Sequence, residues 1–592
     1  MSLFEGVEFR GTFRGYQQRV LDNLDGYVAK GKLNIVAAPG SGKTILGLEI
    51  IRRLGEACLI ISPTNATRDH WGKRFSEYFL GEERALKDFF STDLEKAGVI
   101  NAITYEDLEE YMESYADDGE KKSFKLRRMM REGRIHTICL EEPHHLNAKC
   151  LTALENMREL LEKDVKFLSL TTTPPCGYEE AERKRFFQVC GEIDVRISAS
   201  ELVAEKILCP YQERIYFSAP SKEEAVLLQE YVERVQSALE ELGRLECVQA
   251  SIKTAKRWDI MWAYRYNQLY DKMKRSTPEA YIPMLQLLQY YGLRINKYRA
   301  KQLTGKKKLP PVRWKDMQIA LQFLTDHYDI LGEHRKFIMQ VLRKYNLYQR
   351  KKVQLVPDEL IQKIFLVSVG KLVGIREIVG KEYRTLGKAL RLLVFTEGIP
   401  ANVRNVAYVG TQQEFTTIDV ISIFETVRRQ EIEVKIGVLA NNLLILPIFE
   451  ELQGTMMRMD PLGDTGYAKV DFFGGMPEAV DMVKDLFREG KLQVLIGDQA
   501  LLEEDWVESG INSLILPGFT RDFSLANAMC GIALQRAAEQ PEKNVNIWHL
   551  TTWMPEDGEN IGKWRKGSLG KDKAWYKASL WKRCLPRKQR RN

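Results

Sequence analysis

The sequence predicts an α/β fold in which two doubly wound parallel-sheet lobes are separated by a helical, basic insertion. Short apolar runs alternate with helical patterns in residues 1–216 and again in 361–555, whereas residues 217–360 show long helical stretches without strands. A length of 592 residues suits about three to four domains, and 44% hydrophobic residues can fill several cores. We therefore expect a first lobe, an insertion and a second lobe in these ranges, followed by a basic, aromatic tail at 556–592.

The stretch AAPGSGKT at residues 37–44 lies between an apolar run at 33–36 and a helical pattern at 45–54. Its glycines let backbone N–H groups curve around a phosphate, and the helix that follows adds the positive end of its dipole. At this spacing Lys43 reaches the β and γ phosphates, and Thr44 offers a hydroxyl to Mg²⁺. We therefore predict a nucleoside triphosphate site. The residues expected to form it are Gly40, Ser41, Gly42, Lys43 and Thr44.

A helix is expected to begin within residues 14–18, about 26 residues before Lys43. An aromatic ring beside a glutamine at this distance suits adenine, because the ring can pack on the base while the amide reads its edge. Tyr16 and Gln17 are therefore candidate adenine-binding residues.

Two carboxylates, Glu141 and Glu142, follow the apolar run at 135–140. Because ligands of parallel α/β sheets bind outside the carboxyl ends of the strands, these side chains should share a rim with the phosphate loop. There they can act as a metal-holding group and a water-activating base for phosphate hydrolysis. The alternative is that they only cap the end of a strand.

Positive charge is concentrated in two tracts. Residues 251–352 hold 23 Lys and Arg against 7 Asp and Glu, and residues 563–592 hold 12 against 1. Since Lys and Arg gain affinity by releasing counterions from a phosphate backbone, the tracts predict a nucleic-acid partner, either DNA or RNA. Aromatic residues in the first tract suit stacking on a single strand, unless they form the core of the helical region. The residues expected to contact nucleic acid are Lys306, Lys307, Lys308, Trp575, Arg587 and Lys588.

No apolar run reaches 18 residues, and residues 1–14 lack the order of a signal peptide. We therefore expect a cytoplasmic protein without a membrane partner. The nine cysteines include no CxxC pair and no Cys/His cluster, which argues against a zinc site and against a disulfide framework.

Taken in order, the motifs of the first lobe resemble the RecA-like lobe of superfamily 2 (DEAD/DEAH-like) helicases. The matching motifs are Tyr16-Gln17, AAPGSGKT, SPT, ITY, EEPHH and LTTTPP. The restriction-enzyme and excision-repair translocase branch looks nearest, and with a RecA-like second lobe the resemblance covers about two thirds of the chain. It implies ATP and Mg²⁺ as cofactors, with Thr44 and Glu141 on the metal and Glu142 orienting the attacking water. It also implies that residues 171–173 couple the nucleotide to the nucleic acid.

The second lobe departs from the pattern of that branch. Residues 502–507 read LEEDWV where the branch reads Leu-Gly-Glu-Gly-Trp-Asp. In the sixth motif, Gln-x-Arg-Gly-Arg-x-x-Arg, Ile532 and Gln535 replace both finger arginines. Such an arginine is worth about 10³ to 10⁵ in rate, so hydrolysis should be weak unless Arg521, Arg536 or a protein partner supplies the charge. Glu141 in place of Asp is a further misfit for Mg²⁺, because it adds a methylene.

Two functions therefore remain open. One is a nucleic-acid-dependent ATPase that acts as a translocase or helicase with weakened hydrolysis. The other is a pseudo-helicase that binds nucleotide and nucleic acid as a scaffold or regulatory subunit without efficient turnover. A structural adaptor that ignores nucleotide is a third class.

Overall fold

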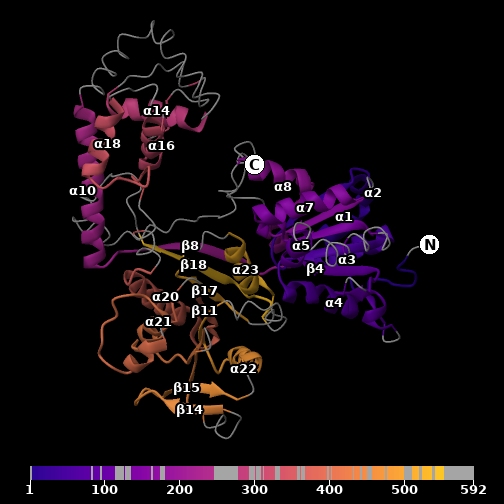
Figure 1. Ribbon diagram of the computed structural model, residues 1–592. Helices are drawn as coiled ribbons and strands as arrows, with labels where there is room; N and C mark the ends of the chain where they lie inside the picture. The colour runs from indigo at the N-terminus through magenta and orange to yellow at the C-terminus, as the bar shows by residue number, and fades with distance from the viewer. Residues whose placement is uncertain are drawn as a thin grey trace, which may run out of the picture.

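The computed structural model contains two large sheets with flanking helices, and a separate group of helices with a two-stranded sheet (Figure 1). It describes residues 3–552 except 82–83, 94–95, 114–125, 127–134, 162–164, 174–179, 246–277, 293–300, 302–307, 311, 327–333, 357–360, 362–366, 397–398, 402, 431, 441–442, 450–456, 474–475, 499–509, 519–522 and 537–539. No helix in the described ranges is long and apolar enough to cross a membrane.

The first sheet has seven strands in the order β3-β4-β2-β5-β6-β1-β7, and every pairing in it is parallel. Its strands are β1 (Lys32–Ala37), β2 (Ala57–Ser62), β3 (Phe90–Ser91), β4 (Ile100–Thr104), β5 (Ile135–Glu141), β6 (Lys166–Thr171) and β7 (Val195–Ile197). The central strands are buried along almost their whole length, because helices cover both faces. This explains why they read as continuous apolar runs, and it confirms the expected doubly wound first lobe.

The helices of the first lobe follow the strands in alternation. They are α1 (Gly15–Asp22), α2 (Leu24–Val28), α3 (Lys43–Leu54), α4 (Asn65–Phe79), α5 (Tyr105–Glu113), α7 (Ala148–Leu160), α8 (Glu180–Cys190) and α9 (Ala199–Ala204), with the short helices η1 (Leu86–Asp88) and η2 (Pro143–His145). Helix α4 begins at Thr64, whose hydroxyl accepts a hydrogen bond from the Thr67 amide. This cap satisfies one of the amides that a helix leaves unpaired at its start.

The second sheet has nine strands in the order β14-β15-β13-β12-β16-β11-β17-β18-β8. They are β8 (Tyr211–Ser218), β11 (Leu392–Phe395), β12 (Ile436–Ala440), β13 (Leu443–Pro447), β14 (Met457–Pro461), β15 (Tyr467–Phe472), β16 (Val494–Gly497), β17 (Ser513–Leu516) and β18 (Val545–Thr552). Around it lie α20 (Gly370–Leu386), α21 (Val420–Arg428), α22 (Met476–Arg488) and α23 (Phe523–Leu534), with η3 (Gly387–Ala389) and η4 (Val403–Tyr408). The α/β class of the second lobe is therefore confirmed.

Two features of this sheet differ from the expectation. Strand β8 pairs in parallel with β18 along eight residues, so the chain joins the second lobe before position 216, the boundary that we expected. An edge strand has unpaired N–H and C=O groups, and the segment leaving the first lobe satisfies those of β18. The three strands β13, β14 and β15 are antiparallel. Only two residues separate β12 from β13, which is too short for a parallel crossover.

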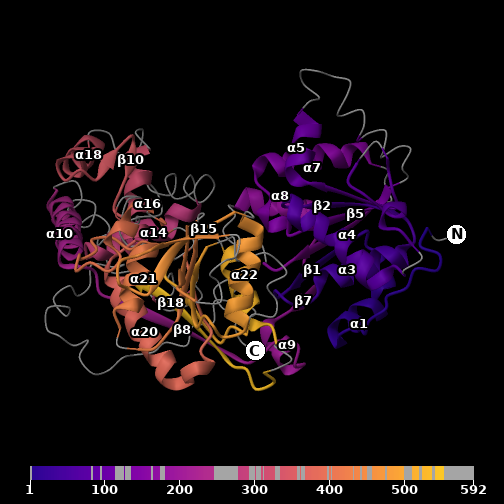
Figure 2. The same cartoon turned by 90° about the horizontal axis from the view of Figure 1, so that it is seen from below.

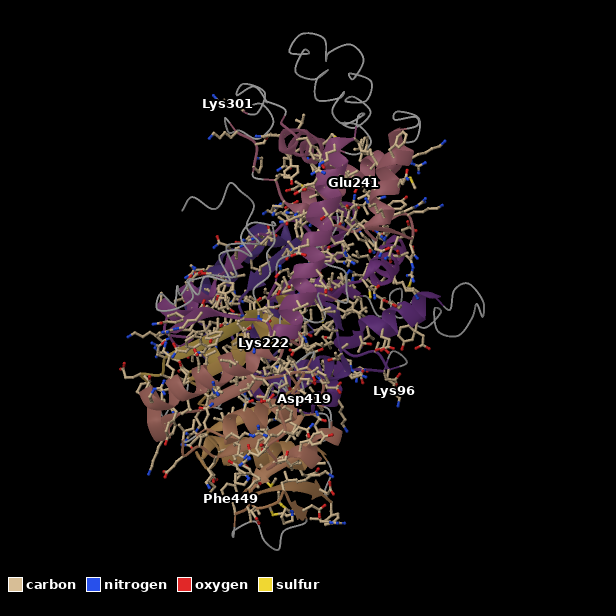
Figure 3. The ribbon with its side chains drawn as sticks, turned by 90° about the vertical axis from the view of Figure 1, so that its left-hand side faces the viewer. Lys96, Lys222, Glu241, Lys301, Asp419 and Phe449 are labelled. Carbon is tan, nitrogen blue, oxygen red and sulfur yellow. The ribbon has the colours of Figure 1, made fainter. Side chains whose placement is uncertain are left out.

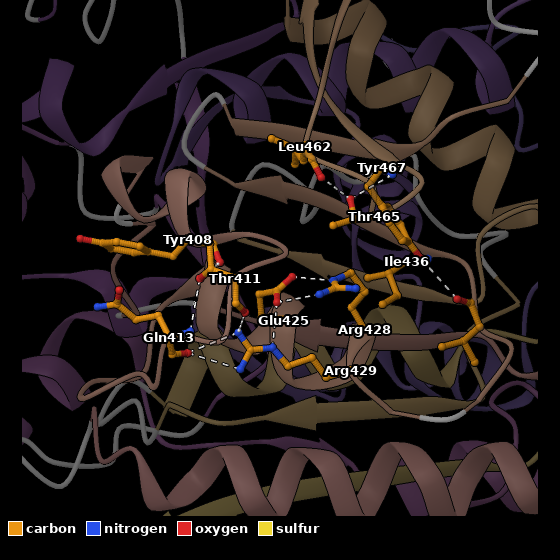
Figure 4. Close-up of polar contacts among 11 residues, drawn as sticks. Tyr408, Thr411, Gln413, Glu425, Arg428, Arg429, Ile436, Leu462, Thr465 and Tyr467 are labelled. Carbon is orange, nitrogen blue, oxygen red and sulfur yellow. Dashed lines mark hydrogen bonds and ion pairs between the residues drawn. The ribbon is translucent and has the colours of Figure 1, made fainter.

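The α-helix that follows β1 and the α-helix that follows β11 contain the same arrangement of charged residues. In α3 and in α21 a buried glutamate bonds two arginines three and four residues further on. The groups are Glu49 with Arg52 and Arg53, and Glu425 with Arg428 and Arg429. In the second lobe Arg429 also donates to the Thr411 carbonyl at 2.9 Å (Figure 4). This contact ties the segment after η4 to α21.

The insertion is helical, as expected, and its helices stand apart from the first lobe in both ribbon views (Figures 1 and 2). It contains α10 (Lys222–Arg244), α14 (Pro278–Tyr290), α16 (Trp314–Asp326) and α18 (His334–Lys344), and then a small hairpin of β9 (Tyr348–Gln349) and β10 (Lys352–Val353). Trp314 packs edge-on against Tyr231 and is 5% exposed. It therefore belongs to the core of the insertion rather than to a stacking surface.

Candidate nucleotide site

The loop between β1 and α3 has the shape that a phosphate requires. Gly40 and Gly42 have φ angles of +75° and +88°, in the left-handed region that favours glycine. Helix α3 begins at Lys43, so the first amides of the helix face the loop. The Ser41 hydroxyl is buried and has no hydrogen-bond partner among the described residues. The residues present therefore fit a bound phosphate group.

Two side chains of helix α1 hold this loop by hydrogen bonds. The Tyr16 hydroxyl donates to the Ser41 carbonyl at 2.8 Å, and the Gln17 amide nitrogen donates to the Gly42 carbonyl at 3.0 Å. The Tyr16 ring has no exposed surface, and burial raises the pKa of its hydroxyl to about 12, so it remains a donor at neutral pH. The expected stacking of this ring on adenine does not fit its position. A role for Gln17 in reading adenine stays a prediction.

Arg14 is a residue at the site that sequence reasoning missed. Its guanidinium donates to the Gly40 carbonyl and lies beside Gly42. Burial lowers the pKa of Arg14. The only signal in the sequence was a cation two positions before Tyr16, and the contact itself depends on how α1 packs against the loop.

Glu142 links the phosphate loop to the ends of β5 and β6. One of its oxygens lies 3.4 Å from the Lys43 ammonium, and the other accepts the Thr172 amide at 2.6 Å. His144 Nδ1 lies 3.2 Å from the same carboxylate. Burial opposes ionisation, but Lys43, His144 and the Thr172 amide outweigh it and hold the pKa of Glu142 well below its usual range. The carboxylate is therefore ionised at neutral pH.

The backbone at Glu142 is also unusual, because its φ of +44° is rare outside glycine. Its amide donates to the Leu170 carbonyl of β6 at 2.7 Å, which holds this conformation. Strain of this kind concentrates at functional sites, so the position agrees with a role for Glu142 in the chemistry.

Glu141 lies in a different environment. One carboxylate oxygen accepts the Ser62 hydroxyl at 2.6 Å and the Trp71 indole N–H at 2.7 Å. The Tyr105 hydroxyl holds the Glu141 carbonyl at 2.8 Å. The contact with Lys43 thus belongs to Glu142. A magnesium role for Glu141 stays a prediction, in which the metal would share the carboxylate with two hydrogen-bond donors.

The threonines that end β6 connect to the same group. His144 Nδ1 lies 2.7 Å from the Thr171 hydroxyl, and that hydroxyl bonds the Thr173 carbonyl at 2.9 Å. The Thr172 hydroxyl donates to Glu142 at 3.0 Å. Polar contacts therefore connect Glu142 to the end of β6 and the segment after it, directly through Thr172 and indirectly through His144 and Thr171.

The second lobe reaches the phosphate loop through α23. A side chain on Gly531 would meet Pro39 at 2.4 Å, and one on Gly40 would meet the Gln535 amide nitrogen at 2.4 Å. The Cys209 amide donates to the Leu534 carbonyl at 3.0 Å, so the chain leaving the first lobe holds the end of α23. The structure thus places an uncharged amide against the loop.

Other predicted residues are distributed as follows. Ile532 of α23 is partly buried against the core, and Arg536 is exposed. Lys308 is exposed in the insertion. The predictions for Lys306, Lys307, residues 502–507, Arg521, Trp575, Arg587 and Lys588 lie outside the described residues.

Comparison with known proteins gives one family match. Residues 10–176 match the model described as "Type III restriction enzyme, res subunit". This match supports the expected helicase-like, ATP-binding character of the first lobe, and it does not extend to the second. The comparison with curated proteins gives no match.

The solved helicase domain of Hef from Pyrococcus furiosus is similar at 12% identity and a TM-score of 0.41, covering 94% of this chain and 98% of that one.

Proposed function

We propose that this protein is a helicase-like, ATP-binding protein that acts on nucleic acid and hydrolyses ATP slowly by itself. The observation that carries the proposal is the pairing of a well-formed phosphate loop with the uncharged amide of Gln535. Lys43 and Glu142 are in contact on the first-lobe side, while Gln535 occupies the second-lobe side. The residues needed to bind a nucleotide are therefore present, whereas α23 contains no positively charged residue that could speed phosphoryl transfer.

In this proposal Gly40, Ser41, Gly42 and Lys43 hold the phosphates, and Thr44 with a carboxylate at the end of β5 holds Mg²⁺. The metal would supply positive charge that offsets the phosphate oxygens. Lys43 would turn from Glu142 toward the phosphates, which removes the partner that does most to keep the pKa of Glu142 low. Glu142 then becomes a better proton acceptor for a water molecule when nucleotide is present.

The second candidate is a pseudo-helicase that binds nucleotide and nucleic acid as a scaffold or regulatory subunit. The aliphatic Ile532 and the amide of Gln535 favour it, because neither carries the positive charge with which an arginine stabilises a transferred phosphoryl group. A protein partner that inserts an arginine would convert this protein into an active ATPase. DNA and RNA are both compatible with the basic tracts.

Phosphate release measured with and without single- and double-stranded DNA and RNA separates the two candidates. We expect weak release for the protein alone, and calorimetric titration with Mg-ATP should show binding. Absence of ATP binding would overturn both candidates in favour of an adaptor. Fast, nucleic-acid-stimulated release would contradict the slow turnover.

A further inference from the structure

The hairpin of β9 and β10 makes its turn with two cations in an unfavourable conformation. Arg350 and Lys351 have φ angles of +49° and +63°. A two-residue turn with both φ values positive normally carries Asn-Gly, and side chains other than Gly, Asn or Asp are disfavoured there. Two long basic side chains at these positions therefore destabilise the folded state, which indicates that the side chains serve a function.

The hairpin is also firmly anchored. The Gln322 side chain of α16 donates to the Lys351 carbonyl at 3.1 Å and accepts the Val353 amide at 2.7 Å. One turn earlier in α16, Gln318 accepts the Leu355 amide at 2.8 Å. Two amide side chains thus fix both the turn and the strand that follows it, so the basic tip is presented on a rigid support.

The cations at this tip are not neutralised. Arg343, Arg350, Lys351 and Lys352 are exposed, and none of them forms an ion pair within the part of the chain that the structure describes. Arg343 lies over the Tyr348 ring at 5.6 Å, which directs it toward the hairpin.

Among the described residues, two acids lie in the same region. Glu241 of α10, labelled in Figure 3, already pairs with Lys344 at 2.6 Å. Asp326 receives a hydrogen bond from Gln322 at 2.9 Å. Four exposed cations therefore remain beside one carboxylate that has no basic partner in the described ranges.

We propose that the β9–β10 hairpin, residues 348–353, binds the phosphate backbone of a nucleic acid. This inference rests on the proposed function and adds a specific site to it. Because the backbone of the turn is already held, binding orders only the side chains, and the cations gain affinity from counterion release. The cost of the strained turn is then offset by binding.

The turn itself provides the test. The double variant Arg350→Asn, Lys351→Gly removes two charges and installs the residues that the turn geometry prefers, so thermal stability should stay equal or rise. Loss of two phosphate contacts should lower duplex affinity about 30-fold at about 0.15 M salt and reduce the log–log salt slope by about 1.8, or by about 1.4 for a single strand. Anisotropy titrations with labelled duplex and single-stranded DNA and RNA measure both quantities.

Two controls make the result specific. Arg350→Lys keeps the charge and should keep the affinity and the slope. The pair Lys87→Asn, Lys388→Asn removes two exposed charges from η1 and η3, which precede strands and so lie away from the carboxyl-end rim. This pair should leave binding nearly unchanged.

A wild-type protein that binds no nucleic acid would overturn the proposed function together with the hairpin. A wild-type protein that binds, with a turn variant of equal affinity and slope, would overturn the hairpin alone.

Discussion

Replacing Gln535 by arginine tests the reasoning about slow turnover most directly. The Gln535 amide nitrogen lies only 2.4 Å from the position that a Cβ on Gly40 would take, so this side chain already contacts the phosphate loop. An arginine at the same place is longer and would carry its charge past Gly40, toward the space that the phosphates occupy. The backbone at this position is held by pairing with Leu208 and by the Lys543 ammonium, which donates to the Gln535 carbonyl at 2.8 Å. The substitution should therefore leave the contact between the lobes intact.

An arginine that meets the transferred phosphoryl group contributes about 10³ to 10⁵ in rate, or about 4 to 7 kcal/mol of barrier at about 1.4 kcal/mol per decade. An arginine introduced at position 535 lacks neighbours that orient it, so it should recover only part of this rate enhancement. We expect Gln535→Arg to raise phosphate release at least about tenfold, and the pair Ile532→Arg, Gln535→Arg to raise it further.

The assay is steady-state phosphate release with saturating Mg-ATP, in the presence and absence of nucleic acid. Gln540→Arg is the matched control, because Gln540 is exposed and the same change there should leave the rate unaltered. If ATP binding persists in both arginine variants but the rate does not rise, then the missing arginines do not limit turnover. A wild-type rate of several per second would refute the reasoning from the start, and would direct attention to Arg521 or Arg536 as the finger.

Three further predictions follow from the same structure. Lys43→Ala should weaken Mg-ATP binding in calorimetric titration, because it removes the only cation at the start of α3; unchanged affinity would refute the assignment of the loop. Deleting residues 563–592 should weaken DNA or RNA binding while leaving ATP binding alone, and equal affinity after deletion would make the tail a solvated segment. Burial lowers the pKa of Lys371 from 10.5 to about 8, and its ammonium donates to the Pro517 carbonyl at 2.6 Å. Because the folded state releases this proton first, the Lys371 contribution to stability should rise between about pH 8 and 10.5, by up to about 3 kcal/mol. Denaturant unfolding of wild type and Lys371→Met across this range checks the sign, and parallel pH curves would contradict it.

Local geometry explains what could be predicted from the sequence. The phosphate loop depends on contiguous residues: a strand brings the chain to Ala37, glycines allow positive φ at positions 40 and 42, and a helix begins at Lys43. Each step follows from backbone sterics within a few residues, so spacing alone predicts it. The same holds for the apolar runs of the first sheet, whose burial on both faces demands continuous hydrophobic sequence.

Only the tertiary structure decided which neighbours these residues meet. The adjacent Glu141 and Glu142 differ by their partners, since Ser62 and Trp71 hold one while Lys43 and Thr172 hold the other. These partners come from distant strands and helices, and no local pattern sets such distances.

The same applies to β8, which completes the sheet of the second lobe although it follows the first lobe in sequence. It applies also to Gln535, which lies against a loop almost five hundred positions earlier in the chain. Motif spacing predicted a triphosphate site. The packing of α1, β5 and α23 around it decided that Tyr16 supports the loop, that Glu142 pairs with Lys43, and that the uncharged amide of Gln535 lies against the loop, because these contacts arise only when distant segments bury their surfaces together.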